Sequence, residues 1–104
     1  MIDDRTADAA RVAAPDAVMA PNAGAHRLLH WTMGEDAGDF DKRLYRLAAH
    51  GINDATYDRL IDGSLVPFEE TADAIARATA GAVLPDDWKA PGAVWDVLPA
   101  ERAA

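Results

Sequence analysis

The residues from Arg43 to Gly63 have the sequence RLYRLAAHGINDATYDRLIDG, and this run predicts two helices joined by a sharp turn. Gly51 ends the first helix, in the left-handed conformation that glycine tolerates best. Asn53 is a favourable N-cap for the second helix, which is predicted over residues 54–62 and ends at Gly63. The run therefore predicts a helix-turn-helix unit, a motif that usually binds DNA.

Helical patterns continue on both sides of this unit. A first helix is predicted over residues 25–33, the helix leading into the turn over 41–50, and a last helix over 68–79. Asp39 or Asp41 can cap the start of the second of these. The inner faces are predicted to hold Leu28, Leu29, Trp31, Phe40, Leu44, Leu47, Ala48, Ile52, Leu60, Ala55 or Tyr57, Phe68, Ala72, Ile75, Ala76 and Thr79.

Residues 82–88 are predicted to be a short strand-like run that enters a turn, where Trp88 covers the core. No segment alternates apolar and polar residues over a useful length, so no sheet is expected. The predicted class is all-α. The expected architecture is a compact four- to five-helix bundle that contains a helix-turn-helix and has flexible N- and C-terminal tails.

Three parts are predicted along the chain. Residues 1–24 are rich in alanine and aspartate and contain few large apolar groups, so they are expected to form a disordered arm. Residues 25–88 form the helix-turn-helix domain, and residues 89–104 form a C-terminal tail. Trp95 lies in this tail between apolar neighbours. It either packs back onto the domain or forms a docking segment for a partner.

Composition excludes several classes of protein. The 104 residues include no cysteine, so disulfides, cysteine nucleophiles and thiolate metal sites are excluded. No apolar run approaches the roughly 18 residues of a membrane span, and acidic residues stand where a signal peptide carries cations. A cytoplasmic protein without a membrane partner is expected. The net charge of −8 disfavours nonspecific binding to phosphates and to anionic membranes.

No pattern of catalytic residues is present. Ser64 is the only serine and lies in a connector, and the chain has no glycine-rich phosphate loop and no nucleophile–base pair. His26 and His30 have the spacing that can chelate a metal on one helix face, but the sequence offers no third ligand. We therefore expect neither an enzyme, nor a cofactor, nor a metal site.

Two linked phrases carry a resemblance to a known group. The first is Gly51-Ile52-Asn53, Thr56, Arg59-Leu60, Gly63 and Val66-Pro67; the second is Ala74-Ile75-Ala76, Ala78-Thr79, Gly81-Ala82-Val83, Pro85 and Asp87-Trp88. In this order they resemble the phage-type Cro/repressor helix-turn-helix family, including small prophage regulators and the YdaS-like group. The resemblance implies a small transcriptional regulator of prophage or mobile-element type that binds double-stranded DNA in the major groove, often as a homodimer.

The resemblance also implies roles for individual residues. The helix over 54–62 becomes the recognition helix, with Arg59 as the main contact to a base or phosphate. Thr56 donates to a phosphate near the helix start, and cations of the preceding helix hold the DNA backbone. The implied base-facing residues are Asn53, Asp54, Ala55, Asp58, Arg59 and Asp62, and the implied backbone contacts are Lys42, Arg43 and Arg46.

The charges of the recognition helix oppose this role. Asp54, Asp58 and Asp62 recur every four residues and so line one helix face, where each like-charged pair costs roughly 0.2–0.5 kcal/mol. Aspartate can accept a hydrogen bond from cytosine N4, but three acids beside one arginine are unusual in a DNA-binding helix. If the three aspartates do not contact bases, they form a solvated helix face, a source of repulsion that sharpens sequence specificity, or a docking face for a basic partner.

An alternative function therefore stays open. In it the same fold is a scaffold that binds a protein partner, such as RNA polymerase, a toxin or another DNA-binding protein. The aspartate face or the Trp95 segment would make the contact. DNA binding requires the exposed cations to converge on one face, whereas partner binding requires an exposed acidic or apolar patch to dominate it.

Overall fold

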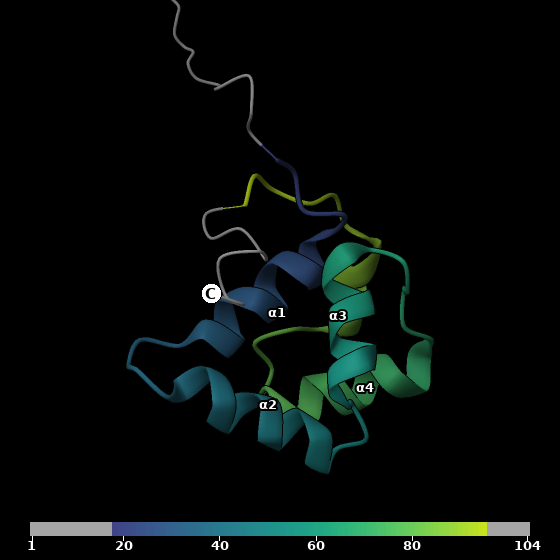
Figure 1. The fold of residues 1–104 in the computed structure, drawn as a ribbon. Coiled ribbons are helices and arrows are strands. Elements are labelled where there is room, and N and C mark those ends of the chain that lie inside the picture. Colours follow the sequence, from purple (N-terminus) through teal and green to yellow (C-terminus); the bar gives the residue numbers. More distant parts are fainter. Residues whose placement is uncertain (1–17, 96–104) are drawn as a thin grey trace, which may run out of the picture.

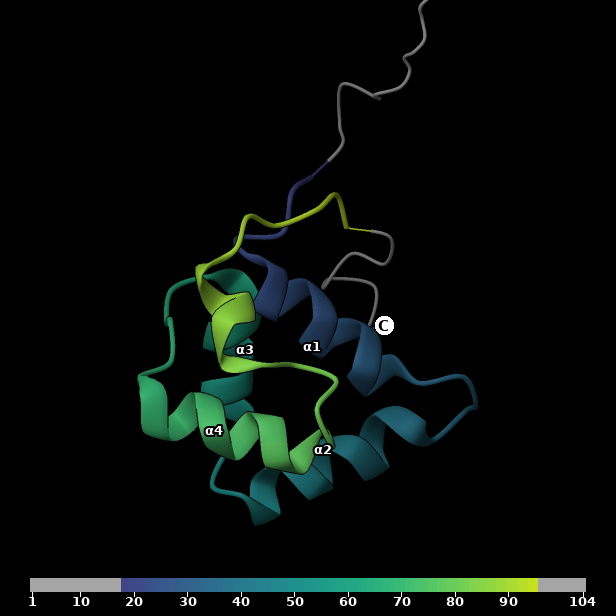
Figure 2. The ribbon, with the colours of Figure 1, turned by 180° about the vertical axis from the view of Figure 1, so that it is seen from behind.

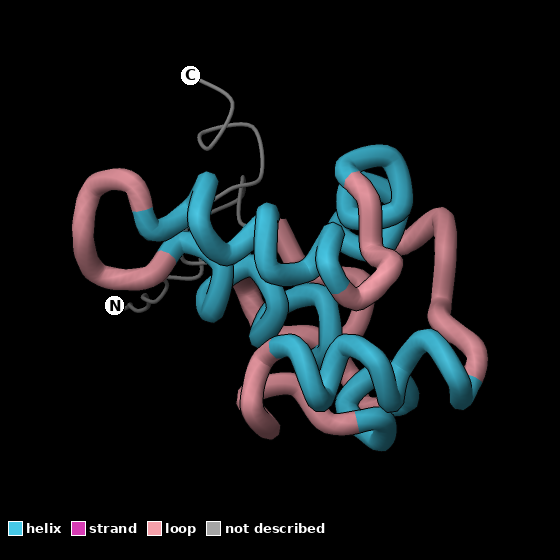
Figure 3. The backbone as a smooth tube through the Cα atoms, turned by 90° about the horizontal axis from the view of Figure 1, so that it is seen from below, coloured by secondary structure: helices cyan, strands magenta, loops and turns pink. Residues whose placement is uncertain are grey.

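Four α-helices and one short 3-10 helix make up the computed structural model, which describes residues 18–95. In chain order these elements are α1 (Ala23–Met33), α2 (Asp39–Ala49), α3 (Asp54–Asp62), α4 (Glu69–Ala78) and η1 (Pro85–Lys89). Across residues 18–95 the helices are joined by loops, and the only strand-like pairing is an isolated bridge (Figure 3). The all-α class predicted from the sequence is confirmed.

Local capping explains where the helices begin and end. The Asn22 side chain accepts a hydrogen bond from the Ala25 N–H at 2.7 Å, so α1 begins two residues earlier than predicted. α3 has the predicted bounds, because the Asn53 side chain caps its first turn and Gly63 ends it with a φ of 85°. α2 begins at Asp39 after a left-handed Gly38, which provides no side-chain cap.

α1 is the element around which the others pack. It contacts α2, α3 and η1, and α4 in turn contacts η1 and α2. α1 and α3 lie side by side in Figures 1 and 2, with α2 and α4 on the opposite side of the core. The fully buried large side chains at the centre are Leu28, Leu29, Leu47, Tyr57, Leu60, Ile61, Ile75 and Val83. The core therefore joins all four helices.

Several predicted core positions differ in the structure. Phe68 is 85% exposed, and Ala48 is also exposed. Of the two alternatives on α3, Tyr57 is the buried residue and Ala55 is exposed. Phe68 is the N-cap of α4 and has an extended backbone, so the 3.6-residue spacing no longer places its side chain on the inner face. The predicted strand-like run over 82–88 is also wrong, because Pro85 opens η1 instead. Trp88 covers the core as predicted, at 4% exposure.

The two ends of the described chain lie side by side. Met19 and Val94 form an antiparallel bridge, and the flanking backbone bonds join Ala20 N–H to the Ala93 carbonyl and Trp95 N–H to the Val18 carbonyl, both at 2.8 Å. The segment before α1 and the last described segment accordingly run together in Figure 2. Residues 18–24, assigned to the arm from the sequence, are thus packed on the domain; residues 1–17 and 96–104 lie outside the described residues.

Candidate nucleic-acid interface

The turn between α2 and α3 fixes how α3 is presented. At the end of α2, the N–H groups of His50 and Ile52 donate to the Leu47 carbonyl, at 2.9 and 3.0 Å. Gly51 has a φ of 89°, which a residue with a Cβ rarely adopts. Ile52 is only 3% exposed and fastens the turn to the core. The turn therefore holds the start of α3 by backbone bonds and by one buried side chain.

α3 has an inner and an outer face that agree with the sequence prediction. Tyr57, Leu60 and Ile61 are buried against the domain. The six residues predicted to face outward are all exposed: Asn53, Asp54, Ala55, Asp58, Arg59 and Asp62. Asp54, Asp58 and Asp62 are spaced by four residues, as are Ala55 and Arg59, so these side chains lie on neighbouring rows of one helix face.

Asn53 and Thr56 form the cap of this helix. The Asn53 Oδ1 accepts a hydrogen bond from the Thr56 N–H at 2.9 Å. This bond satisfies one of the backbone donors that the first turn of a helix leaves without a partner. Thr56 is half-buried, whereas Asn53 is exposed. The side-chain oxygen of Asn53 therefore positions the start of α3.

Arg43 lies apart from the other cations of α2. Its guanidinium donates to the Trp31 carbonyl and stands over the Trp31 ring, with 5.1 Å between the Cζ and the ring centroid. This bond and the cation–π contact tie α2 to α1. Lys42 and Arg46 are exposed. Of the four cations predicted to contact DNA, three are therefore exposed: Lys42, Arg46 and Arg59.

Exposed carboxylates are more numerous in α3 and the helix that follows it than the sequence prediction recognised. Glu69, Glu70 and Asp73 at the start of α4 are exposed as well, so residues 53–73 carry six exposed acids and the single cation Arg59. The acids of α4 were overlooked because the prediction treated α3 alone. The signal was available, since three acids within five residues stand at a predicted helix start. Acids there are favourable to the helix dipole.

Asp62 has a local role at the end of α3. Its carboxylate accepts a hydrogen bond from the Ser64 N–H at 2.7 Å. Hydrogen bonds from Ser64, first from its side chain and then from its backbone, lower the pKa of this carboxyl, and the charge of Arg59 adds to the effect. Asp62 therefore remains charged at the C-terminal edge of the α3 surface at neutral pH.

His26 and His30 lie on α1, away from α3. Their ring centroids are 4.6 Å apart, as the four-residue spacing predicts. Among residues 18–95, no group of three or more histidine, cysteine, aspartate or glutamate side chains is arranged to hold a metal ion. In the same part of the chain, no helix has both the length and the apolar character needed to cross a membrane.

Comparison with known proteins found no matching protein-family model, no matching curated protein and no matching solved structure.

Proposed function

We propose that this protein is a small helix-turn-helix regulator that binds double-stranded DNA by placing α3 in the major groove. The observation that carries the proposal is the presentation of α3, whose outward residues are all exposed and whose start is held by the Gly51 turn and the Asn53 cap. A helix with its side chains is about 10–12 Å wide, which matches a major groove about 12 Å wide.

Each exposed polar residue has a distinct role in this proposal. Arg59 is the only cation of α3 and makes the main contact to a guanine edge or a phosphate. Lys42 and Arg46, four residues apart on α2, contact the backbone phosphates. Asp54 and Asp58 accept from cytosine N4 or repel unsuitable sequences. A homodimer would repeat these contacts in a second half-site about one helical turn away.

The charges make the expected binding unusual. With three exposed cations available, at most about three phosphates are neutralised in each half-site, and log Kd then changes with log salt concentration with a slope of about 2.7 for one subunit and about 5.4 for a homodimer. The carboxylates repel the phosphates at any sequence, so nonspecific affinity is expected to be low. Specific sites should therefore be distinguished mainly by base contacts.

Fluorescence anisotropy with labelled duplexes tests this proposal. The duplexes are fragments of the source genome, among them the region upstream of the gene, and the salt concentration is varied from roughly 50 to 200 mM. The expected result is binding to a few fragments with the shallow salt slope given above. If no fragment binds even at the lowest salt, the proposal is wrong.

A second candidate function is supported by the six exposed carboxylates of α3 and α4. In this candidate the surface binds a basic protein partner, such as a DNA-binding protein, a toxin or a subunit of RNA polymerase. Complementary charge steers such partners and accelerates association. The Trp95 segment contributes less to this candidate, because the Trp95 side chain is only 8% exposed.

A pair of variants separates the two candidates. Asp58→Asn/Glu70→Gln neutralises two acids of the proposed docking surface, and Asp36→Asn/Asp86→Asn neutralises two exposed acids elsewhere. A basic partner identified by affinity capture should bind the first variant more weakly and the second normally. Equal binding to both variants would eliminate the acidic surface as a docking site.

A further inference from the structure

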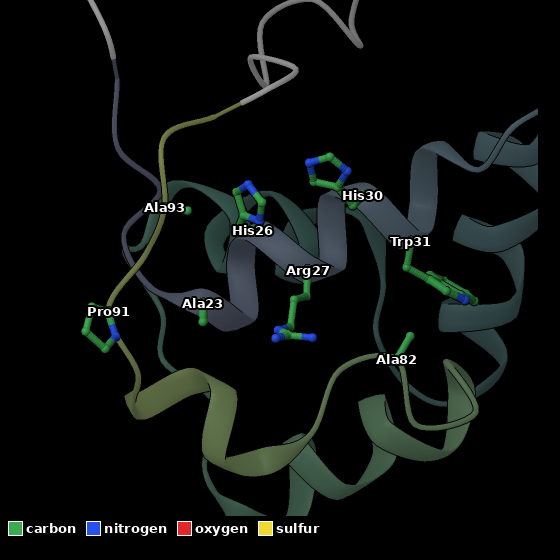
Figure 4. A pocket seen from close by; sticks show the side chains of 8 residues that line it. All are labelled: Ala23, His26, Arg27, His30, Trp31, Ala82, Pro91 and Ala93. Carbon is green, nitrogen blue, oxygen red and sulfur yellow. The ribbon is translucent and has the colours of Figure 1, made fainter. Parts of the chain in front are cut away.

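A pocket of about 670 Å³ is built from α1 and the segment that follows α4, and no residue of α3 lines it. Figure 4 shows that His26, Arg27, His30 and Trp31 line it from α1, while Ala82 and Pro91 line it from the later segment. Its volume is within the range of about 300–1,000 Å³ typical of small-molecule sites. No role in the proposed DNA contact falls on these residues.

The pocket is open because its walls carry small side chains. Ala23, Ala82 and Ala93 contribute only methyl groups. The walls are also fixed in place on two sides. A Cβ on Gly24 would stand 2.3 Å from the Trp88 ring, and a Cβ on Gly92 would stand 2.1 Å from the Ala20 carbonyl oxygen. These close approaches hold η1 against α1 and the 90–94 segment against the residues just before α1, so the pocket walls are part of the fold.

Nitrogen-bearing side chains supply the polar groups of the pocket. Arg27 is 60% exposed at the side chain, and its Nε lies 3.7 Å from the Asp87 Oδ1, a loose ion pair. Asp87 also accepts from the Leu84 N–H through its other oxygen at 2.8 Å. Among the described residues that line the pocket none is a carboxylate. Because an ion pair at 3.7 Å on an exposed side chain contributes little, the Arg27 guanidinium can exchange Asp87 for a bound anion.

The aromatic groups indicate a flat ligand. The Trp31 indole lines the pocket, and the His26 ring is stacked on Trp95 with 5.7 Å between centroids. The Nε2 of His26 is buried and has no hydrogen-bond partner among the described residues. A buried polar atom of this kind is uncommon in folded proteins. In Figure 4 the His26 and His30 rings lie on the opposite side of α1 from the Arg27 guanidinium, so this atom does not face the same space as Arg27.

From these observations we infer that the pocket binds a small aromatic carboxylate. Its carboxylate pairs with the Arg27 guanidinium, whose planar fork matches that group. Its ring lies against the Trp31 indole and the alanine walls, where apolar contact supplies affinity. Binding of this ligand in the pocket does not depend on DNA binding by α3.

Nuclear magnetic resonance titration of the full chain with 2-naphthoate tests the inference. The expected result is a saturable shift of backbone amide signals from α1 and from residues near Ala82 and Ala93. The neutral analogue 2-naphthamide and inorganic phosphate should each bind far more weakly, because one lacks the charge and the other lacks the ring. Equally strong binding of inorganic phosphate would overturn the aromatic part of the inference.

Two variants make the assignment specific. Arg27→Gln is expected to raise the Kd for 2-naphthoate at least tenfold, because it removes the charged donor, whereas the charge-matched Arg77→Gln on α4 should not change it. Ala82→Phe, at an exposed position, should weaken binding by filling the pocket. No saturable shift with the unmodified protein, or an unchanged Kd in both Arg27→Gln and Ala82→Phe, would overturn the inference.

Discussion

At the scale of single residues, Asp39 stabilises the loop between α1 and α2. Its carboxylate accepts hydrogen bonds from the backbone N–H groups of Glu35 and Asp36, both at 3.0 Å. The bond from Asp36, then that from Glu35, and the charges of Arg43 and Lys42 lower the pKa of Asp39. The sequence predicted this residue, or Asp41, as a helix cap; in the structure its carboxylate organises the preceding loop.

A pH dependence follows from the lowered pKa of Asp39. Because the carboxyl is more acidic in the folded chain than in the unfolded chain, its stabilising contribution is present at neutral pH and above the unfolded pKa. It is lost as the pH falls below about 4, through the lowered pKa of the folded state. Asp39→Asn should therefore lower the unfolding free energy at pH 6, and the difference from the unmodified protein should shrink towards pH 2. Urea denaturation at several pH values measures this; a difference that stays constant to pH 2 would contradict it.

Asn53 provides a second prediction at this scale. Asn53→Ala removes the acceptor for the Thr56 N–H and should lower the unfolding free energy by about 0.5–2 kcal/mol. Asn53→Asp keeps an acceptor in the same place and adds a charge that the helix dipole favours, so it should be close to neutral. Thermal denaturation followed by circular dichroism compares the two. If both variants are equally destabilised, the side chain has a role other than capping.

At the scale of elements, the accuracy of the sequence prediction depended on whether a helix end is determined locally. α3 was predicted with both of its ends because Asn53 and Gly63 are local signals. η1 was predicted as a strand-like run because Ala82, Val83 and Leu84 suit a strand, whereas Pro85 and the bond from the Leu84 N–H to Asp87 favour the 3-10 turn. Local propensity could not decide between a strand-like run and a 3-10 turn for this segment.

At the candidate interface, too, the positions along one helix were predicted, whereas a contact between two helices was not. The outward positions of α3 were those that the family resemblance implied, and all of them are exposed. The position of Arg43 on Trp31 could not be predicted, because the two residues are twelve apart and meet only when α1 and α2 pack. Long-range contacts of this kind leave no periodic signal in a single sequence.

The contact between α1 and η1 yields a prediction for two elements together. The Trp88 ring occupies the place where a Cβ of residue 24 would stand, so Gly24→Ala should destabilise the fold by about 1–3 kcal/mol despite the better helix propensity of alanine. In a Trp88→Leu background the ring is absent and Gly24→Ala should become neutral or stabilising. Urea denaturation of the four proteins completes this double-mutant cycle. Independent, additive effects would contradict the proposed contact.

At the scale of the whole molecule, the last described segment belongs to the domain. Trp95 is 8% exposed, its N–H donates to the Val18 carbonyl, and its ring stacks on His26. The sequence had left open whether Trp95 packs on the domain or docks a partner. Its burial favours the first alternative, and Figure 1 shows the described segments before α1 and after η1 close together above α1.

Two aromatic residues test this packing. Trp95→Ala should lower the unfolding free energy by about 3 kcal/mol, the range for a buried aromatic residue. Phe68→Ala should change it by less than about 0.5 kcal/mol, because Phe68 is 85% exposed. Denaturation in urea gives both values under the same conditions. A negligible effect of Trp95→Ala would mean that this segment does not stabilise the domain.

The molecule as a whole combines an exposed α3, on which the proposed DNA contact rests, with a surface charge that opposes that contact. Under the proposed function, the net charge of −8 and the six acids of residues 53–73 would restrict DNA binding to sites where base contacts outweigh phosphate repulsion. Arg59 is the residue on which this balance depends, since it is the only cation of α3.

The most direct test compares Arg59→Ala with Arg77→Ala, which removes the same charge from an exposed position on α4. Anisotropy titration of a bound DNA fragment at one salt concentration gives the Kd of each protein. The proposal predicts that Arg59→Ala weakens binding by about 1–3 kcal/mol while Arg77→Ala leaves it nearly unchanged. Equal losses in the two variants, or no loss in Arg59→Ala, would contradict the claim that α3 contacts DNA.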